Sequence, residues 1–192
     1  NYAYVPFTNS ADIDAIILDA RDAQKMPEQL SAYLFREIGW HIVGLEPNGY
    51  SGFSATVFAN GTDKVLAIRG TEIGGPIDTY QDLLATDLAE IGLLGLAASQ
   101  AVALFNYVQR LSAPAGADNV LQLTLRKSDL PPSGTSFIDR GEFAAGRYVW
   151  LEASHSGEGL GVLQPGDELT VTGHSLGGHL AALTLRLFPD LF

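Results

Sequence analysis

The stretch from Glu168 to Phe188 constrains the fold of this chain more than any other. Glu168–Thr172 alternates in the way a short strand does, and Leu176–Phe188 has the composition of a helix. Between them lies Gly173–Gly177, which reads Gly-His-Ser-Leu-Gly. Joining a strand to a helix this tightly forces a sharp turn, and only small residues fit two positions before and after the serine. The spacing therefore predicts a strand–turn–helix unit with Ser175 at its tip.

Such a unit suits a particular kind of chemistry. A serine hydroxyl is a weak nucleophile, so it must be presented to a base and placed beside hydrogen-bond donors for a developing oxyanion. The free N–H groups and the positive end of the following helix point at that position. We therefore predict Ser175 as a nucleophile, the N–H of Leu176 as an oxyanion donor, and Gly173 and Gly177 as the glycines that permit the turn.

Two motifs resemble a known family. Thr172–Ala181 (Thr-Gly-His-Ser-Leu-Gly-Gly-His-Leu-Ala) resembles the nucleophile turn of the lipase class 3 family and of related bacterial extracellular lipases. Leu66–Thr71 (Leu-Ala-Ile-Arg-Gly-Thr) is similar to that family's apolar strand ending in Arg-Gly-Ser/Thr. The resemblance covers roughly residues 30–192. It implies an α/β-hydrolase fold, a mostly parallel sheet with flanking helices, here incomplete at its C-terminus. It also implies that Thr71 supplies the second oxyanion N–H.

The same resemblance implies the function. We expect a serine carboxylic-ester hydrolase, a triacylglycerol lipase or an esterase, that acts through an acyl-enzyme on Ser175. Its substrates would be lipids at a lipid–water interface or other esters. The alternatives are a phospholipase, a thioesterase or a peptidase of the same fold. No cofactor is required and no metal site is predicted, and calcium enters only through the resemblance. Relatives of this kind are secreted by bacteria, although no signal peptide is visible at the N-terminus.

The general base and the acid of a catalytic triad are harder to find. In the implied fold they follow the serine, but only 17 residues come after Ser175. His179 would ride on the same helix one turn on, and Asp190 would lie beyond its far end. His155, in an expected loop, is the least unsuitable base. We therefore expect the base and acid outside this chain, on a missing C-terminal half. The alternative is a non-catalytic fragment or interaction module that lacks a base.

We expect the whole chain, residues 1–192, to form one partial domain. Segments on either side of Asn60-Gly61 predict a hairpin, and the turn dipeptide strengthens it. The excess length between the two motifs lies within about 113–166, which could form a lid or a plain surface hairpin. The remaining expected elements are helices at 11–24, from Pro27 to Gly39, at 78–111 in two segments and at 176–188, and strands at 53–59, 64–69, 120–125, 147–151 and 168–172.

Composition excludes several classes of function. Hydrophobic residues make up 46% of the chain, so a globular core is expected rather than disorder. The net charge of −11 disfavours nucleic acid as a partner. The absence of cysteine removes disulfides, thiolate metal sites and a cysteine nucleophile. The uncharged run Ile91–Val108 contains glycines and polar residues, so we expect a buried core helix there rather than a membrane span.

Overall fold

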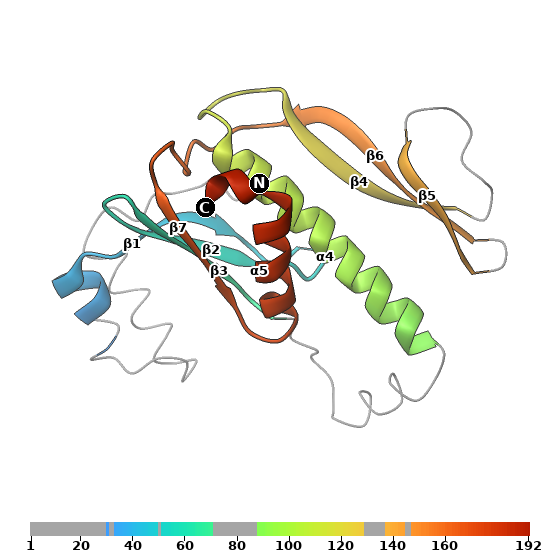
Figure 1. The fold of residues 1–192 in the computed structure, drawn as a ribbon, viewed down its shortest axis with the longest axis horizontal. Helices are drawn as coiled ribbons and strands as arrows, with labels where there is room; N and C mark the ends of the chain where they lie inside the picture. The colour runs from blue at the N-terminus through green and yellow to red at the C-terminus, as the bar shows by residue number, and fades with distance from the viewer. Residues whose placement is uncertain (1–29, 31–32, 50, 71–87, 129–136, 145–146) are drawn as a thin grey trace.

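The structure is a computed structural model. It describes residues 30, 33–49, 51–70, 88–128, 137–144 and 147–192 (Figure 1). The expected helix at 11–24, most of the helix from Pro27 and the first part of the region 78–111 lie outside these residues. Thr71, expected to be an oxyanion donor, also lies outside them.

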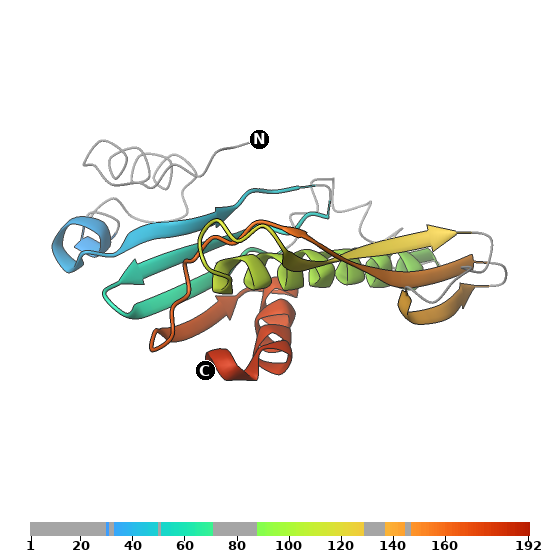
Figure 2. The same cartoon turned by 90° about the horizontal axis from the view of Figure 1, so that it is seen from above.

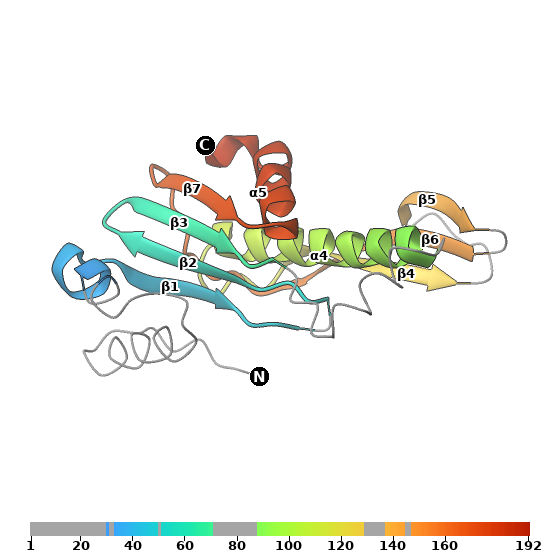
Figure 3. The same ribbon diagram turned by 90° about the horizontal axis from the view of Figure 1, so that it is seen from below.

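Four strands form the larger sheet, which we call sheet A. They are β1 (His41–Glu46), β2 (Ala55–Asn60), β3 (Asp63–Ile68) and β7 (Glu168–Gly173), in the order β1-β2-β3-β7. The pairs β1–β2 and β2–β3 are antiparallel, whereas β3 and β7 are parallel. Both of these parallel strands run toward the start of helix α5 (Leu176–Leu187), as Figure 3 shows. Their carboxyl ends therefore lie side by side although they are far apart in the sequence.

The predicted α/β-hydrolase fold, with its mostly parallel sheet, is wrong. Sheet A has a single parallel pair, and the second sheet of the described chain is antiparallel throughout, so the fold is small and β-rich. The reason lies in the connections, because Asn60 pairs with Asp63 across a tight turn in which Gly61 has φ +61°. A turn this short can only join antiparallel strands, while a parallel pair needs a long crossover.

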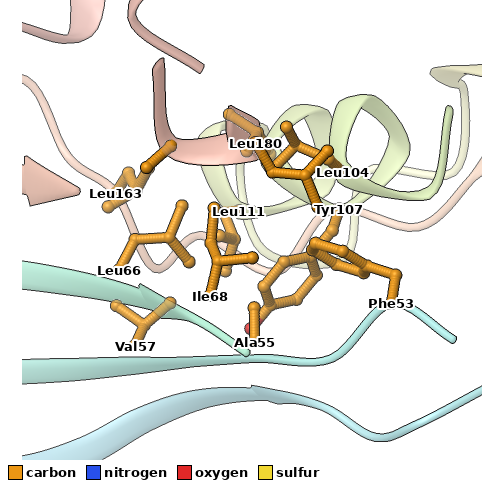
Figure 4. Close-up of a cluster of buried hydrophobic side chains, with 12 residues drawn as sticks. Phe53, Ala55, Val57, Leu66, Ile68, Leu104, Tyr107, Leu111, Leu163 and Leu180 are labelled. Carbon is orange, nitrogen blue, oxygen red and sulfur yellow. The ribbon is translucent and has the colours of Figure 1, made fainter. Parts of the chain in front are cut away.

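The main core lies between one face of sheet A and two helices, α4 (Leu88–Ser112) and α5. Burial along β2 alternates residue by residue, as expected for a strand with one face toward the core. Figure 4 shows the strand side chains pointing at the two helices. The fully or nearly buried members are Phe53, Ala55, Val57, Leu66, Ile68, Leu104, Tyr107, Val108, Leu111, Leu163, Leu180 and Ala181.

Helix α4 is continuous from Leu88 to Ser112, so a boundary between the two helical segments expected within 78–111 does not fall in the described part of that range. It buries Leu104, Val108 and Leu111 in the core that Figure 4 draws in part. Within the described ranges, no helix combines the length and the apolar character that crossing a membrane requires.

Three further strands form a separate sheet, sheet B. They are β4 (Val120–Ser128), β5 (Phe137–Ala144) and β6 (Arg147–Gly157), in the antiparallel order β4-β6-β5. Helix α4 lies between α5 and β4 in each view, so sheet B is on the other side of α4 from α5 (Figures 1 and 2). Sheet B falls within the segment 113–166, and its role as a lid stays a prediction.

The side chain of Asn106 ties sheet B to α4, in addition to the bond that Gln122 of β4 donates from Nε2 to the backbone oxygen of Asn106 at 3.3 Å. Asn106 of α4 donates from Nδ2 to the carbonyl oxygen of Leu123 at 2.8 Å and accepts the N–H of Leu123 on Oδ1 at 2.7 Å. The amide thus pairs with both polar groups of one β4 residue, as a neighbouring strand would. These two bonds satisfy backbone polar groups on the edge of β4 that does not pair with β6.

Two element boundaries differ from those expected. A helix was predicted from Pro27 to Gly39, and its described C-terminal part is a single π-helical turn, η1 (Tyr33–Ile38). Phe35 of this turn packs against Phe58 of β2, with 6.0 Å between the ring centroids. Strand β6 continues to Gly157, so His155, expected in a loop, lies in a strand. Its backbone is fixed by pairing with Leu121.

Candidate active site

Ser175 occupies the turn between β7 and α5, with the strand and the helix on either side that the sequence predicts. Its backbone has φ 56° and ψ −126°. Among the described residues it is the one non-glycine with positive φ. Such a conformation costs a side-chain-bearing residue about 1–3 kcal/mol, and it persists where the surrounding structure enforces it. A glycine would adopt this conformation without strain, so the presence of serine points to a use for its hydroxyl.

The hydroxyl of Ser175 does not stabilise the helix that it precedes. Ser175 is the N-cap residue of α5, a position where a serine side chain commonly accepts a backbone N–H. Here it makes no capping hydrogen bond. The residue is also solvent-exposed. The side chain is therefore accessible and is not committed to a structural hydrogen bond of the helix end.

The two predicted glycines are sterically required. A Cβ on Gly173 would overlap the carbonyl oxygen of Gly177 and lie 2.9 Å from that of Ile68. A Cβ on Gly177 would lie 2.5 Å from the Ile68 oxygen and 3.1 Å from the backbone nitrogen of Gly70. Real Cβ atoms essentially never lie within 3.0 Å of another heavy atom, so any side chain at either position would push the turn away from the end of β3.

Gly70 is a third glycine that packs against this turn, and no role was predicted for it. It follows β3, and a Cβ there would lie 2.7 Å from the carbonyl oxygen of His174 and 3.6 Å from the Cβ of Ser175. The parallel pairing of Ile68 with Gly173 brings the two chain segments together. The signal in the sequence was a glycine directly after an apolar strand, but its partner is a hundred residues away along the chain.

The start of α5 offers one N–H for an oxyanion. The N–H of Gly177 bonds the His174 oxygen at 2.9 Å, and that of Gly178 bonds the Ser175 oxygen at 2.9 Å. The Leu176 N–H has no acceptor in the described part of the chain. It lies at the positive end of the helix dipole, where a negative charge is stabilised. Within the described residues the Leu176 N–H is therefore available to an oxyanion, and its role as a donor stays a prediction.

No histidine is bonded to the Ser175 hydroxyl within the described residues, which include all four histidines. His179 instead approaches the backbone oxygen of Ser175, with Nδ1 at 3.3 Å, from one turn along α5. His155 belongs to sheet B, beyond α4. His174 and His41 are both exposed. Asp190 lies in the short 3₁₀ helix η2 (Pro189–Leu191) past the end of α5.

Within the described residues no metal cluster is present, and a cavity that they line lies away from this turn. No group of three or more His, Asp or Glu side chains in the described ranges is arranged to bind a metal ion. A partly open cavity of about 400 Å³ lies at the other end of β7, lined by Asp167 and Leu169 among others. Because β7 runs from that cavity toward Ser175, the cavity is not part of the candidate site.

In comparisons with known proteins, the chain matches no family model, no curated protein and no solved structure. The resemblance to class 3 lipases therefore rests on the two short motifs alone.

Proposed function

We propose that this chain carries the nucleophile of a serine carboxylic-ester hydrolase, and that Ser175 is that nucleophile. The observation that carries the proposal is the backbone of Ser175, held at φ 56° with its hydroxyl unused as a helix cap. Strain of this kind gathers at functional sites, where geometry matters more than local stability. The proposal concerns this local turn and does not depend on an α/β-hydrolase fold.

The chemistry follows from the groups around the turn. The Oγ of Ser175 forms a bond to the carbonyl carbon of the ester, and the carbonyl oxygen becomes an oxyanion. The N–H of Leu176 donates to that oxygen, and Thr71 is proposed as the second donor. The carbon–oxygen bond to the alcohol then breaks and the alcohol leaves with a proton. Water hydrolyses the resulting acyl-enzyme to the acid and restores the serine.

A base must take the proton of Ser175, and we propose that it is none of the four histidines of this sequence. His179 bonds a backbone oxygen rather than the hydroxyl, which supports this assignment. The competing proposal is a module that keeps the turn but has no base and does not hydrolyse esters. The two differ in the reactivity of one hydroxyl, which can be measured directly.

The substrate class is proposed from the motifs at 66–71 and 172–181. Their resemblance to class 3 lipases favours acylglycerol esters at a lipid–water interface, with small soluble esters, phospholipids and thioesters as further candidates. Secretion by a bacterium and a requirement for calcium belong to the same proposal. Neither rests on a residue of the described chain.

A fluorophosphonate probe tests the proposed nucleophile. The full-length protein is treated with the probe, and the modified peptide is located by mass spectrometry. We expect one adduct, on Ser175, because only an activated serine attacks the phosphorus centre rapidly. Ser175→Ala should abolish labelling. Ser154→Ala is the matched control, since Ser154 is another exposed serine, hydrogen-bonded to Ser156 in β6, and it should keep full labelling.

The outcomes separate the two proposals. Labelling that is lost in Ser175→Ala and kept in Ser154→Ala supports the hydrolase. A wild-type protein that stays folded and takes up no probe, or a label that survives Ser175→Ala, rejects Ser175 as the nucleophile and favours the inactive module.

A further inference from the structure

The end of β3 and the turn at Ser175 fit together through backbone atoms alone. The carbonyl oxygen of Ile68 faces the sites where Gly173 and Gly177 would carry a Cβ, at 2.9 Å and 2.5 Å. Two residues later, Gly70 faces the carbonyl oxygen of His174 at 2.7 Å from its own Cβ site. The contact is thus reciprocal, with glycines on both segments and a carbonyl oxygen opposite each one.

The His174 carbonyl is the sensitive member of this contact. Its oxygen accepts the N–H of Gly177 at 2.9 Å, a bond that helps define the first turn of α5. Its carbon also belongs to the peptide that sets φ of Ser175. A displacement of this carbonyl would therefore rotate the Ser175 backbone and re-aim the N–H of Leu176 in the same movement.

We infer that Gly70 is a positioning residue for Ser175, acting through the carbonyl of His174. The missing side chain at 70 lets β3 approach closely enough to hold that carbonyl, and with it the positive φ of Ser175. A methyl group at 70 cannot be accommodated by a side-chain rotation, because the atom it meets is backbone. As a statement about hydrolysis this inference rests on the proposed function. As a statement about the Ser175 backbone it stands on the contacts.

The first measurement compares Gly70→Ala with Gly159→Ala. Gly159 is the matched control because its Cβ site also meets a backbone carbonyl, that of Pro114, and it is remote from the turn in the segment after β6. For each variant we measure the rate of fluorophosphonate labelling. We also measure kcat and KM for a p-nitrophenyl ester, both at a temperature below the unfolding midpoint of that variant. For Gly70→Ala we expect kcat and the labelling rate to fall by about tenfold or more with KM nearly unchanged.

Gly159→Ala should lower the unfolding midpoint and leave kcat and the labelling rate of the folded protein as in the wild type. A Gly70→Ala variant that is less stable but reacts at the wild-type rate would overturn the inference. An equal loss of rate in both variants would also overturn the inference, because a side chain at any glycine in close contact with backbone would then have the same effect.

The second measurement needs no activity. In a Ser175→Gly background the residue at 175 can follow a displaced carbonyl without strain. If Gly70 acts through the Ser175 backbone, Gly70→Ala should lower the unfolding midpoint less in this background than in the wild type. Gly159→Ala should lower it equally in both backgrounds, since distant sites are additive.

This double-mutant cycle separates the inference from the proposed function. Equal destabilisation by Gly70→Ala in both backgrounds, including a failure to fold in both, would overturn the inference. A wild-type protein that takes up no probe but shows the coupling would reject the hydrolase and support Gly70 as the residue that positions Ser175.

Discussion

At Ser175 the backbone and the side chain place opposite demands on the residue. The backbone conformation, φ 56° and ψ −126°, is one that glycine adopts most easily. The proposed chemistry needs a hydroxyl there. If the hydroxyl is kept for function, the protein is less stable than it would be with glycine at this position.

Ser175→Gly should therefore stabilise the protein while it removes probe labelling. Relief of about 1–3 kcal/mol of backbone strain is partly offset by about 0.4–1 kcal/mol, because glycine gives the unfolded chain more freedom. We expect a net gain of about 1 kcal/mol, measured as a higher urea midpoint at unchanged slope. Ser175→Ala is the control, since alanine keeps the strain. A gain as large in the alanine variant would show that loss of the hydroxyl, and not of strain, is responsible.

The attachment of sheet B to helix α4 is the element-scale feature that one substitution can test. Asn106→Ala removes both bonds to Leu123 and leaves a part-buried N–H and a carbonyl of β4 unsatisfied. We expect a loss of about 1–3 kcal/mol of stability, together with faster hydrogen exchange at the Leu123 amide.

Gln164→Ala is the control for this substitution. Its Nε2 donates one exposed bond to the Gly161 oxygen at 2.6 Å, so its loss should be within about 0.5 kcal/mol. If Asn106→Ala left exchange at Leu123 unchanged, the amide would not be what holds β4 to the helix.

Elements with local causes could be predicted from the sequence, and their assembly could not. The hairpin at Asn60-Gly61 and the strand–turn–helix around Ser175 depend on residues a few positions apart, and both are present. The predicted strand directions were wrong because a turn as short as the one at Gly61 makes the strands it joins antiparallel, whereas the family resemblance implies a mostly parallel sheet. Gly70 was missed because the carbonyl that requires it comes from a remote segment.

Across the whole molecule, Arg110 connects three parts of the fold. It extends from α4, with Nη1 at 3.8 Å from Oε2 of Glu46 in β1. Its Nε donates to the carbonyl oxygen of Glu158, just after β6, at 3.1 Å. Burial raises the pKa of Glu46 above its ordinary 4.5 more than the charge of Arg110 lowers it.

Glu46 should therefore make stability depend on pH. With a raised pKa the folded protein binds this proton more readily than the unfolded chain, so the contribution of Glu46 to stability grows as the pH falls through the folded pKa toward 4.5. We expect Glu46→Gln to gain most over the wild type near neutral pH, and the difference in urea midpoint to shrink on acidification. A difference that widened on acidification would contradict the direction of this pKa change.

The parallel register of β3 and β7 has a consequence for how the protein reaches its native state. Asp63 pairs with Glu168 and Ile68 with Gly173, so partners are separated by 105 positions along the chain. Closing so long a loop carries a larger entropic penalty than closing the hairpin at Gly61, and such contacts tend to form late in folding. The turn at Ser175 cannot take its strained shape until that closure is made. The nucleophilicity proposed for Ser175 would therefore be acquired only after this closure, and partly folded molecules, with their apolar surface still exposed, would carry an unreactive serine.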